Sequence, residues 1–399
     1  MEKLGHPAQE SILSTIYTFN QYMQNELLAD CVQDMVDYVL DMLRLPLKSN
    51  LSNNIEILKD LEQMPENIKH GCNQRLSGFL LQEGVEDFSP FKGGKQRLLK
   101  ALKALCLDFF ESLNIKWIGY VVIGRQYSYD HIARVLSIPV DATFSVDQYF
   151  GLFHEIGHVI IRNKEYFKAS PLPEHLIELF DHKGGLSREI FCDLFDYQCG
   201  FLGYYSLYEK TVPHYLAELM KKKDITIDIV EKYVLRFLCV TIYQNNYMQN
   251  HASKTKLVNL TKKILNKFLK ESGAEQQFEN EKEDLVSRLV YSANEMNDVL
   301  LVFNKLYTQK LSVFCQKRIE TFSSNKFKAQ FKQIMNGQIV HDLDHPQLVV
   351  LAMLKKKQTQ EIPFKAHVAA IQSFLNCYNT NNWDGTYFPY KRFVAKQSE

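Results

Sequence analysis

The feature that most constrains this chain is the pattern His-Glu-x-x-His within residues 150–161, a run whose apolar residues have helical spacing. On a helix, residues four positions apart lie one above the other, so His154 and His158 direct their imidazoles toward a common point. Two imidazoles do not complete a tetrahedral zinc site, so a third ligand must come from elsewhere in the chain. Glu155 lies one step round the helix, where a carboxylate can take a proton from water that a metal activates.

The residues around this pattern predict where the helix begins and how it packs. Ser145 followed by Gln148 resembles a capping box, which predicts a helix from about Val146 with both histidines on rigid backbone. Gly157 is a poor helix former, by about 1 kcal/mol relative to alanine, so we expect another segment to pack closely there. Core packing without a metal would explain Gly157 equally well. The His-Glu-x-x-His pattern would also arise from two solvated or capped histidines on an ordinary amphipathic helix.

The third ligand is the question that this pattern leaves open. In one class of zinc proteases, a glycine stands three positions after the second histidine and another histidine stands six positions after it. Ile161 and Lys164 occupy those positions here, which excludes that arrangement. Further along, Glu189 and Asp193 are four residues apart and share a helix face, with Asp196 on the same side. In a metal site, one carboxylate can bind the metal while a second accepts the free N–H of a ligating imidazole. The alternative is that these two acids lie on a solvated helix face, which would have the same spacing.

Together the two patterns resemble those of the gluzincin metallopeptidases, in which HExxH is followed on a later helix by ExxxD or ExxxN. The resemblance is closest to the ImmA/IrrE-like family, whose second motif reads E-x-x-A-N-x-F-A, and it covers about fifty residues, 150–200. Four residues of this chain fall on that frame, with Cys in place of Ala and Asp in place of Asn: Glu189, Cys192, Asp193 and Phe195. The ExxAD form of the CAAX-prenyl-protease type also fits locally. Those are membrane enzymes, however, and no apolar stretch here reaches a membrane-spanning length.

The resemblance implies a role for each motif residue. His154, His158 and Glu189 are the expected ligands of a Zn²⁺ ion, and Glu155 is the expected general base. Asp193 is expected to lie behind the ligands and orient one imidazole.

One position departs from the family pattern. Asp196 stands where the family often has alanine, so it can compete with Asp193 for the orienting role. The residue that helps to polarise a substrate carbonyl is not identified by the sequence, and four side chains remain candidates for it: His175, His182, Tyr197 and Tyr204.

Composition sets the class of protein and its partners. The chain has 399 residues, 46% of them hydrophobic, and Lys+Arg 47 against Asp+Glu 46 leaves almost no net charge, so we expect neither nucleic acid nor membrane as a partner. The eight cysteines are dispersed without a Cys-x-x-Cys pair, which indicates buried thiols in a reducing compartment. The N-terminus lacks the apolar core of a signal peptide, so a cytoplasmic location is expected.

The pattern along the chain predicts an α+β fold that is predominantly α-helical. We expect a helical N-terminal region at 1–116, a zincin-like metallopeptidase core at 117–250 and a helical C-terminal region at 251–399. Two β-rich runs, 117–123 and 134–140, are separated by polar turn residues. In zincins a small sheet lies over the HExxH helix and an edge strand pairs with extended substrate. Pro139 favours such an edge position for the second strand.

These observations predict a zinc-dependent metalloendopeptidase that hydrolyses peptide bonds of a specific protein substrate. Two alternatives come from other functional classes. One is a catalytically inactive zincin-like protein that binds a partner or has a regulatory role through its helical regions. The other is a regulatory sensor in which zinc is structural. The oligomeric state is left open by the sequence.

Overall fold

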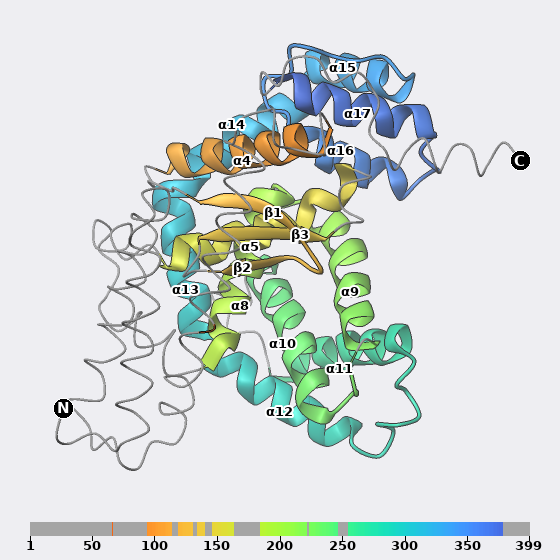
Figure 1. The fold of residues 1–399 in the computed structure, drawn as a ribbon. Helices are drawn as coiled ribbons and strands as arrows, with labels where there is room; N and C mark the ends of the chain where they lie inside the picture. Colours follow the sequence, from red (N-terminus) through yellow and green to blue (C-terminus); the bar gives the residue numbers. More distant parts are fainter. Residues whose placement is uncertain are drawn as a thin grey trace, which may run out of the picture. The chain divides into compact units, whose positions relative to one another are not determined.

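The computed structural model describes residue 66 and the ranges 94–113, 119–130, 134–139, 146–162, 184–221, 223–245 and 254–377. These residues are mostly helical and include one three-stranded sheet, as the α+β, predominantly α-helical prediction requires (Figure 1). The chain divides into two compact units, of which one holds the sheet and the other extends over Ser145–Ser373. None of the described helices combines the length and the apolar character that crossing a membrane requires. The predicted three-part division of the chain stays a prediction.

The first unit contains a helix and the sheet. Helix α4 (Gly94–Ser112) buries an apolar stripe that includes Leu98, Leu102 and Phe109. Its Lys103 Nζ lies 4.2 Å from the centre of the Tyr120 ring in strand β1. Helix α4 therefore contacts the sheet through strand β1.

The sheet consists of β1 (Tyr120–Gly124), β2 (Ser128–Asp130) and β3 (Val135–Pro139), in the order β1-β3-β2. Strand β3 pairs in parallel with β1 and antiparallel with β2, so it is the central strand of the described sheet. The predicted edge position was therefore wrong.

Two features explain this difference. Strand β2 lies in the polar residues that the sequence indicates as a turn, and its three residues are too few to give an alternating pattern. Pro139 is the last residue of β3, opposite Gly124, so its missing N–H falls at the end of the ladder, where it interrupts little pairing.

The second unit is helical and carries both motifs. Two short turns flank the motif helices, and the helices that follow run to the end of the described chain. In order, the elements are η4 (Val146–Tyr149), α5 (Phe150–Arg162), α8 (Gly184–Phe195), η5 (Asp196–Gly200), α9 (Tyr205–Lys221), α10 (Ile227–Gln244), α11 (Lys254–Ser272), α12 (Lys282–Glu295), α13 (Asn297–Leu306), η6 (Tyr307–Leu311), α14 (Ser312–Ser323), α15 (Asn325–Met335), α16 (Leu348–Lys357) and α17 (Phe364–Cys377).

Helix α10 is the centre of this unit. It contacts α8, α9, α11 and α12 (Figure 1). Its side chains are buried on nearly every face from Tyr233 to Ile242. A helix that is apolar all round is a core helix, and Thr226 caps its start by accepting a hydrogen bond from the Ile229 N–H. Arg236 is the charged residue in this buried stretch, so it requires a partner of opposite charge.

The cysteines agree with the prediction of buried thiols. Of the six that the structure describes, five are buried and Cys377 is partly exposed.

The HExxH helix begins close to the predicted residue. A 3₁₀ turn starts at Val146 and continues into the α-helix at Phe150. Within this turn Asp147 is fully buried, and Lys357 at the end of α16 places its Nζ 2.7 Å from the carboxylate. A helix from the C-terminal part of the chain therefore holds the first turn of the motif helix in place.

Replacing Lys357 with methionine is expected to destabilise the protein by about 1–3 kcal/mol, because the Asp147 carboxylate stays buried and loses a cationic partner. Chemical denaturation followed by circular dichroism measures the change. Lys356→Met, one residue earlier in the same helical turn, is the matched control and should have little effect. Equal midpoints for the two variants would show that this ion pair does not stabilise the helix start.

Candidate metal centre

Helices α5 and α8 approach each other closely at Gly157. A Cβ atom added to this glycine would lie 3.0 Å from the Cα atom of Cys192 and 3.1 Å from its Cβ and Sγ atoms. The prediction that another segment packs against the helix at Gly157 is therefore confirmed, and that segment is α8. Because the helices touch here, the acidic residues of α8 reach the two histidines of α5.

The two imidazoles and Glu189 lie together at this crossing. His154 Nε2 is 3.5 Å from Glu189 Oε2, and His158 Nε2 is 3.5 Å from Glu189 Oε1. Two ligands of a tetrahedral zinc ion, each bound at about 2.1 Å, are about 3.4 Å apart, so each imidazole lies at ligand distance from one oxygen of the Glu189 carboxylate. The side chains of all three residues are partly exposed, which leaves one side of the cluster open to solvent.

Asp193 occupies the orienting position. Its Oδ1 lies 2.9 Å from His154 Nδ1, so this nitrogen donates to the carboxylate and Nε2 is turned toward Glu189. Asp196 is buried in the π-helical turn η5, and among the described residues its Oδ1 has no hydrogen-bond partner. Burial raises the pKa of Asp196 well above its usual range, which favours the neutral acid. Asp193, not Asp196, is therefore placed to orient the imidazole.

The two histidines have opposite electrostatic surroundings. Burial alone lowers the pKa of His154, but the charge of Asp193 and the hydrogen bonds that His154 donates to Asp193 and Glu189 outweigh it and raise the pKa to about 10. Burial and the charge of His154 lower the pKa of His158 to about 3. The imidazole pair therefore carries one positive charge, on His154, and an ion bound to both rings would displace the extra proton.

The two glutamates also differ. Burial would raise the pKa of Glu189, but the Arg236 guanidinium and the hydrogen bond from His154 hold it well below its usual range, so Glu189 is charged. Glu155 is almost completely buried, and burial raises its pKa to about 7. A carboxyl group with a pKa near neutrality is suited to accept and return a proton.

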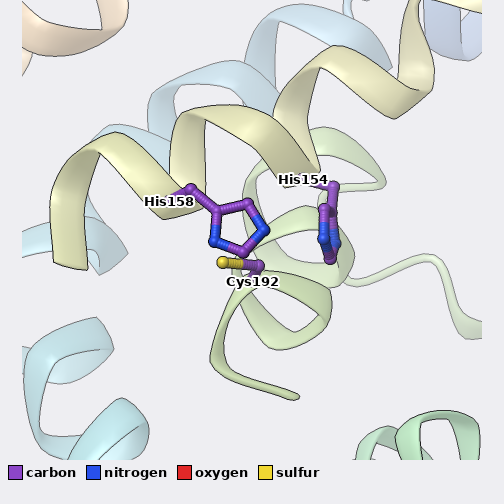
Figure 2. A group of neighbouring side chains, drawn as sticks. All are labelled: His154, His158 and Cys192. Atoms are coloured by element: carbon purple, nitrogen blue, oxygen red, sulfur yellow. The ribbon is translucent and has the colours of Figure 1, made fainter. Parts of the chain in front are cut away.

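Cys192 is a second candidate for the third ligand. One nitrogen of each histidine and the sulfur of Cys192 lie within 4.8 Å of one another, and Figure 2 shows both rings projecting from α5 toward the part of α8 that carries this cysteine. Burial, with the negative charges of Glu189 and Glu155, raises the pKa of the thiol well above its usual range. Glu189 is the better candidate because it is charged, partly exposed and equally close to the Nε2 atoms of both rings.

Arg236 completes the cluster from α10. Its Nε and Nη2 atoms donate to the two oxygens of Asp193 at 2.7 Å and 2.8 Å, and its Nη1 lies 2.8 Å from Glu189 Oε2. The sequence motifs do not include Arg236, and Cys192 entered only as a replacement for alanine. Arg236 was missed from the sequence, although a single charged residue within the apolar run 233–240 is a signal that could have drawn attention to it. For Cys192 the corresponding signal is its spacing of three from Glu189.

Of the four candidates for carbonyl polarisation, the two tyrosines have other partners in the described part of the chain. His175 and His182 lie outside the described residues. The Tyr197 hydroxyl donates to the Gly203 carbonyl at 3.0 Å and also contacts Gln244. The Tyr204 ring packs on Phe322, with 5.5 Å between the ring centres.

Asp193→Asn is expected to lower zinc affinity by about 10–100-fold, because the amide is neutral and supports the His154 ring less strongly than a carboxylate. Competition with a chromophoric chelator measures the affinity. Asp196→Asn is the matched control and should keep the wild-type value, because Asp196 Oδ1 has no hydrogen-bond partner among the described residues and burial favours the neutral acid. A larger loss in Asp196→Asn would reverse the two assignments.

Comparison with protein-family models, with curated proteins and with solved structures finds no match for this chain. The resemblance to gluzincins therefore rests on the two motifs and on the positions of their side chains at the crossing of α5 and α8.

Proposed function

We propose that this protein is a zinc-dependent metallopeptidase of gluzincin type. His154, His158 and Glu189 hold the ion, and Glu155 is the general base. The observation that carries the proposal is the convergence of two motifs from separate helices, with each Nε2 atom 3.5 Å from an oxygen of one carboxylate. Two histidines and one glutamate are a donor set of catalytic zinc sites, in which the fourth position stays open for water or substrate.

The charges of the cluster also suit a divalent cation. When ionised, Glu155, Glu189 and Asp193 contribute three negative charges, and Arg236 contributes one positive charge. Without an ion, protonated His154 brings the sum to −1; with both imidazoles neutral, as metal binding requires, the charge is −2, which one divalent cation neutralises.

The residues of the site then have distinct tasks in peptide hydrolysis. Bound zinc supplies a Lewis acid that polarises the scissile carbonyl and makes water more acidic. Glu155 accepts a proton from the attacking water and delivers it to the leaving amine, for which its pKa of about 7 is suited. Asp193 holds the His154 ring so that its Nε2 faces Glu189. The order of small strands followed by the two motif helices is that of a zincin core and supports the same reading.

One observation favours the alternative, a catalytically inactive zincin-like interaction or regulatory protein. The ion pairs that join Arg236 to Glu189 and Asp193, and Asp193 to His154, form a network that needs no metal to satisfy its charges. Zinc content separates the two functions: the purified peptidase should contain one zinc per chain, and the inactive protein should contain none.

The experiment that tests the proposal compares protein N-termini in cells that express the wild-type chain or Glu155→Gln. New N-termini that appear only with the wild type would identify the cleaved protein and its cleavage site. Identical sets of N-termini, at equal expression of both forms, would contradict peptidase activity.

A further inference from the structure

Arg236 lies where a free charge would be strongly destabilising. Its side chain is almost completely buried in the apolar stretch of α10, between the buried residues Leu235 and Phe237. Burying an unpaired guanidinium would cost several kcal/mol, so the surroundings of Arg236 must satisfy it. Those surroundings are the two acidic residues of α8 that face the histidines.

The guanidinium divides its donors between these two acids. One edge forms two parallel hydrogen bonds to Asp193, and the remaining nitrogen, Nη1, lies 2.8 Å from Glu189 Oε2. The two oxygens of Glu189 are therefore unequal. Oε2 is held by Arg236 and also lies 3.5 Å from His154 Nε2, whereas Oε1 lies 3.5 Å from His158 Nε2.

We infer that Arg236 is a positioning residue for the proposed zinc site: it fixes the Glu189 carboxylate so that Oε1 is the oxygen left for the ion, and it fixes Asp193 so that His154 keeps its orientation. The inference rests on the proposed function, because it assigns Arg236 a task toward the same ion. The planar fork of arginine suits this task, since its donors are rigidly placed and match two carboxylates at once. A lysine supplies the same charge from a single point.

The competing explanation is that Arg236 only neutralises buried carboxylates. Arg236→Lys separates the two explanations, because it keeps the charge and removes the fork. Arg318→Lys on α14 is the matched control: Arg318 is also buried, and it donates to the Phe314 carbonyl and packs against the Phe314 ring. It therefore reports the general effect of replacing a buried arginine.

The measurements use the full chain, with zinc for affinity and cobalt(II) as a spectroscopic probe. Arg236→Lys is expected to bind zinc about 10–100-fold more weakly than the wild type. Its cobalt(II) form is expected to absorb visible light more weakly, because a released Glu189 carboxylate offers both oxygens and raises the coordination number. Arg318→Lys is expected to match the wild type in both measurements. Wild-type affinity and spectrum in Arg236→Lys would overturn the positioning role.

A second measurement needs no variant, in case Arg236→Lys does not fold. Infrared difference spectra of the wild-type chain on addition of zinc report how carboxylates bind the ion. A wide separation between the two carboxylate stretching bands is expected, because a single oxygen binds. A narrow separation, typical of both oxygens binding, would overturn the inference while leaving the zinc site intact. A wild-type chain that binds neither zinc nor cobalt(II) would instead overturn the proposed function and this inference together.

Discussion

Glu155→Gln is expected to lower kcat/KM for peptide hydrolysis by about 10²–10⁴-fold while zinc content stays at the wild-type level. Glutamine has nearly the shape of glutamate but cannot accept the proton of the attacking water. Glu155 is not one of the three proposed ligands, and its pKa of about 7 suits proton transfer at neutral pH. The rate is measured on a peptide that spans the cleavage site found in cells, and zinc is measured by elemental analysis of the same sample.

The control for this variant is Glu209→Gln on α9, which makes the same chemical change away from the two motifs. It should keep the wild-type rate and zinc content. Two results would contradict the assignment of Glu155: hydrolysis at the wild-type rate, or a loss of zinc that parallels the loss of activity. The second result would make Glu155 a ligand or a structural residue.

Glu189→Ala is expected to lower zinc affinity by more than about 100-fold, beyond the effect typical of residues that only support a ligand. The physical reason is that the Glu189 carboxylate is charged and lies close to both imidazoles. Cys192→Ala, three residues later on the same helix face, is expected to stay within about 10-fold of the wild type, because its thiol holds its proton. Competition with a chelator at fixed pH measures both.

The pair of variants decides between the two candidate third ligands. If Cys192→Ala loses zinc and Glu189→Ala keeps it, the ligand set is two histidines and a cysteine, and Glu189 serves as the partner of Arg236. If both variants keep full affinity, the cluster at the crossing of α5 and α8 is not the zinc site.

The parts of the site that depend on local spacing could be predicted from the sequence. The four-residue spacing of His154 and His158 places both on one helix face, and the same spacing places Glu189 and Asp193 together on α8. Gly157 indicated the close approach of a second segment. None of these inferences depends on how distant helices pack.

Contacts between distant helices could not be predicted in this way. Arg236 lies 43 residues from Asp193, and no spacing rule links a residue of α10 to the acids of α8. The sequence also left open whether Asp193 or Asp196 orients the imidazole, because on a regular α-helix both residues would lie on the same side. In the structure, the chain changes to a π-helical turn at Asp196, which changes the direction of the side chains that follow.

The sheet illustrates the same limit for the fold. The two apolar runs were recognisable as strands because β-branched residues dominate them. Their positions in the sheet could not be predicted, because the short polar strand β2 was not recognisable as a strand. In the structure, β2 pairs with β3 and makes β3 the central strand. Proline at the end of a strand has little effect on the ladder, so Pro139 did not identify an edge.

The central claim is that His154, His158 and Glu189 together hold one divalent ion, and X-ray absorption at the zinc edge of the zinc-loaded wild-type chain tests it most directly. We expect one zinc per chain with nitrogen and oxygen neighbours only, at about 2.0–2.2 Å, and with the multiple-scattering signal of two imidazoles. A sulfur neighbour at about 2.3 Å, or a chain that retains no zinc, would contradict it.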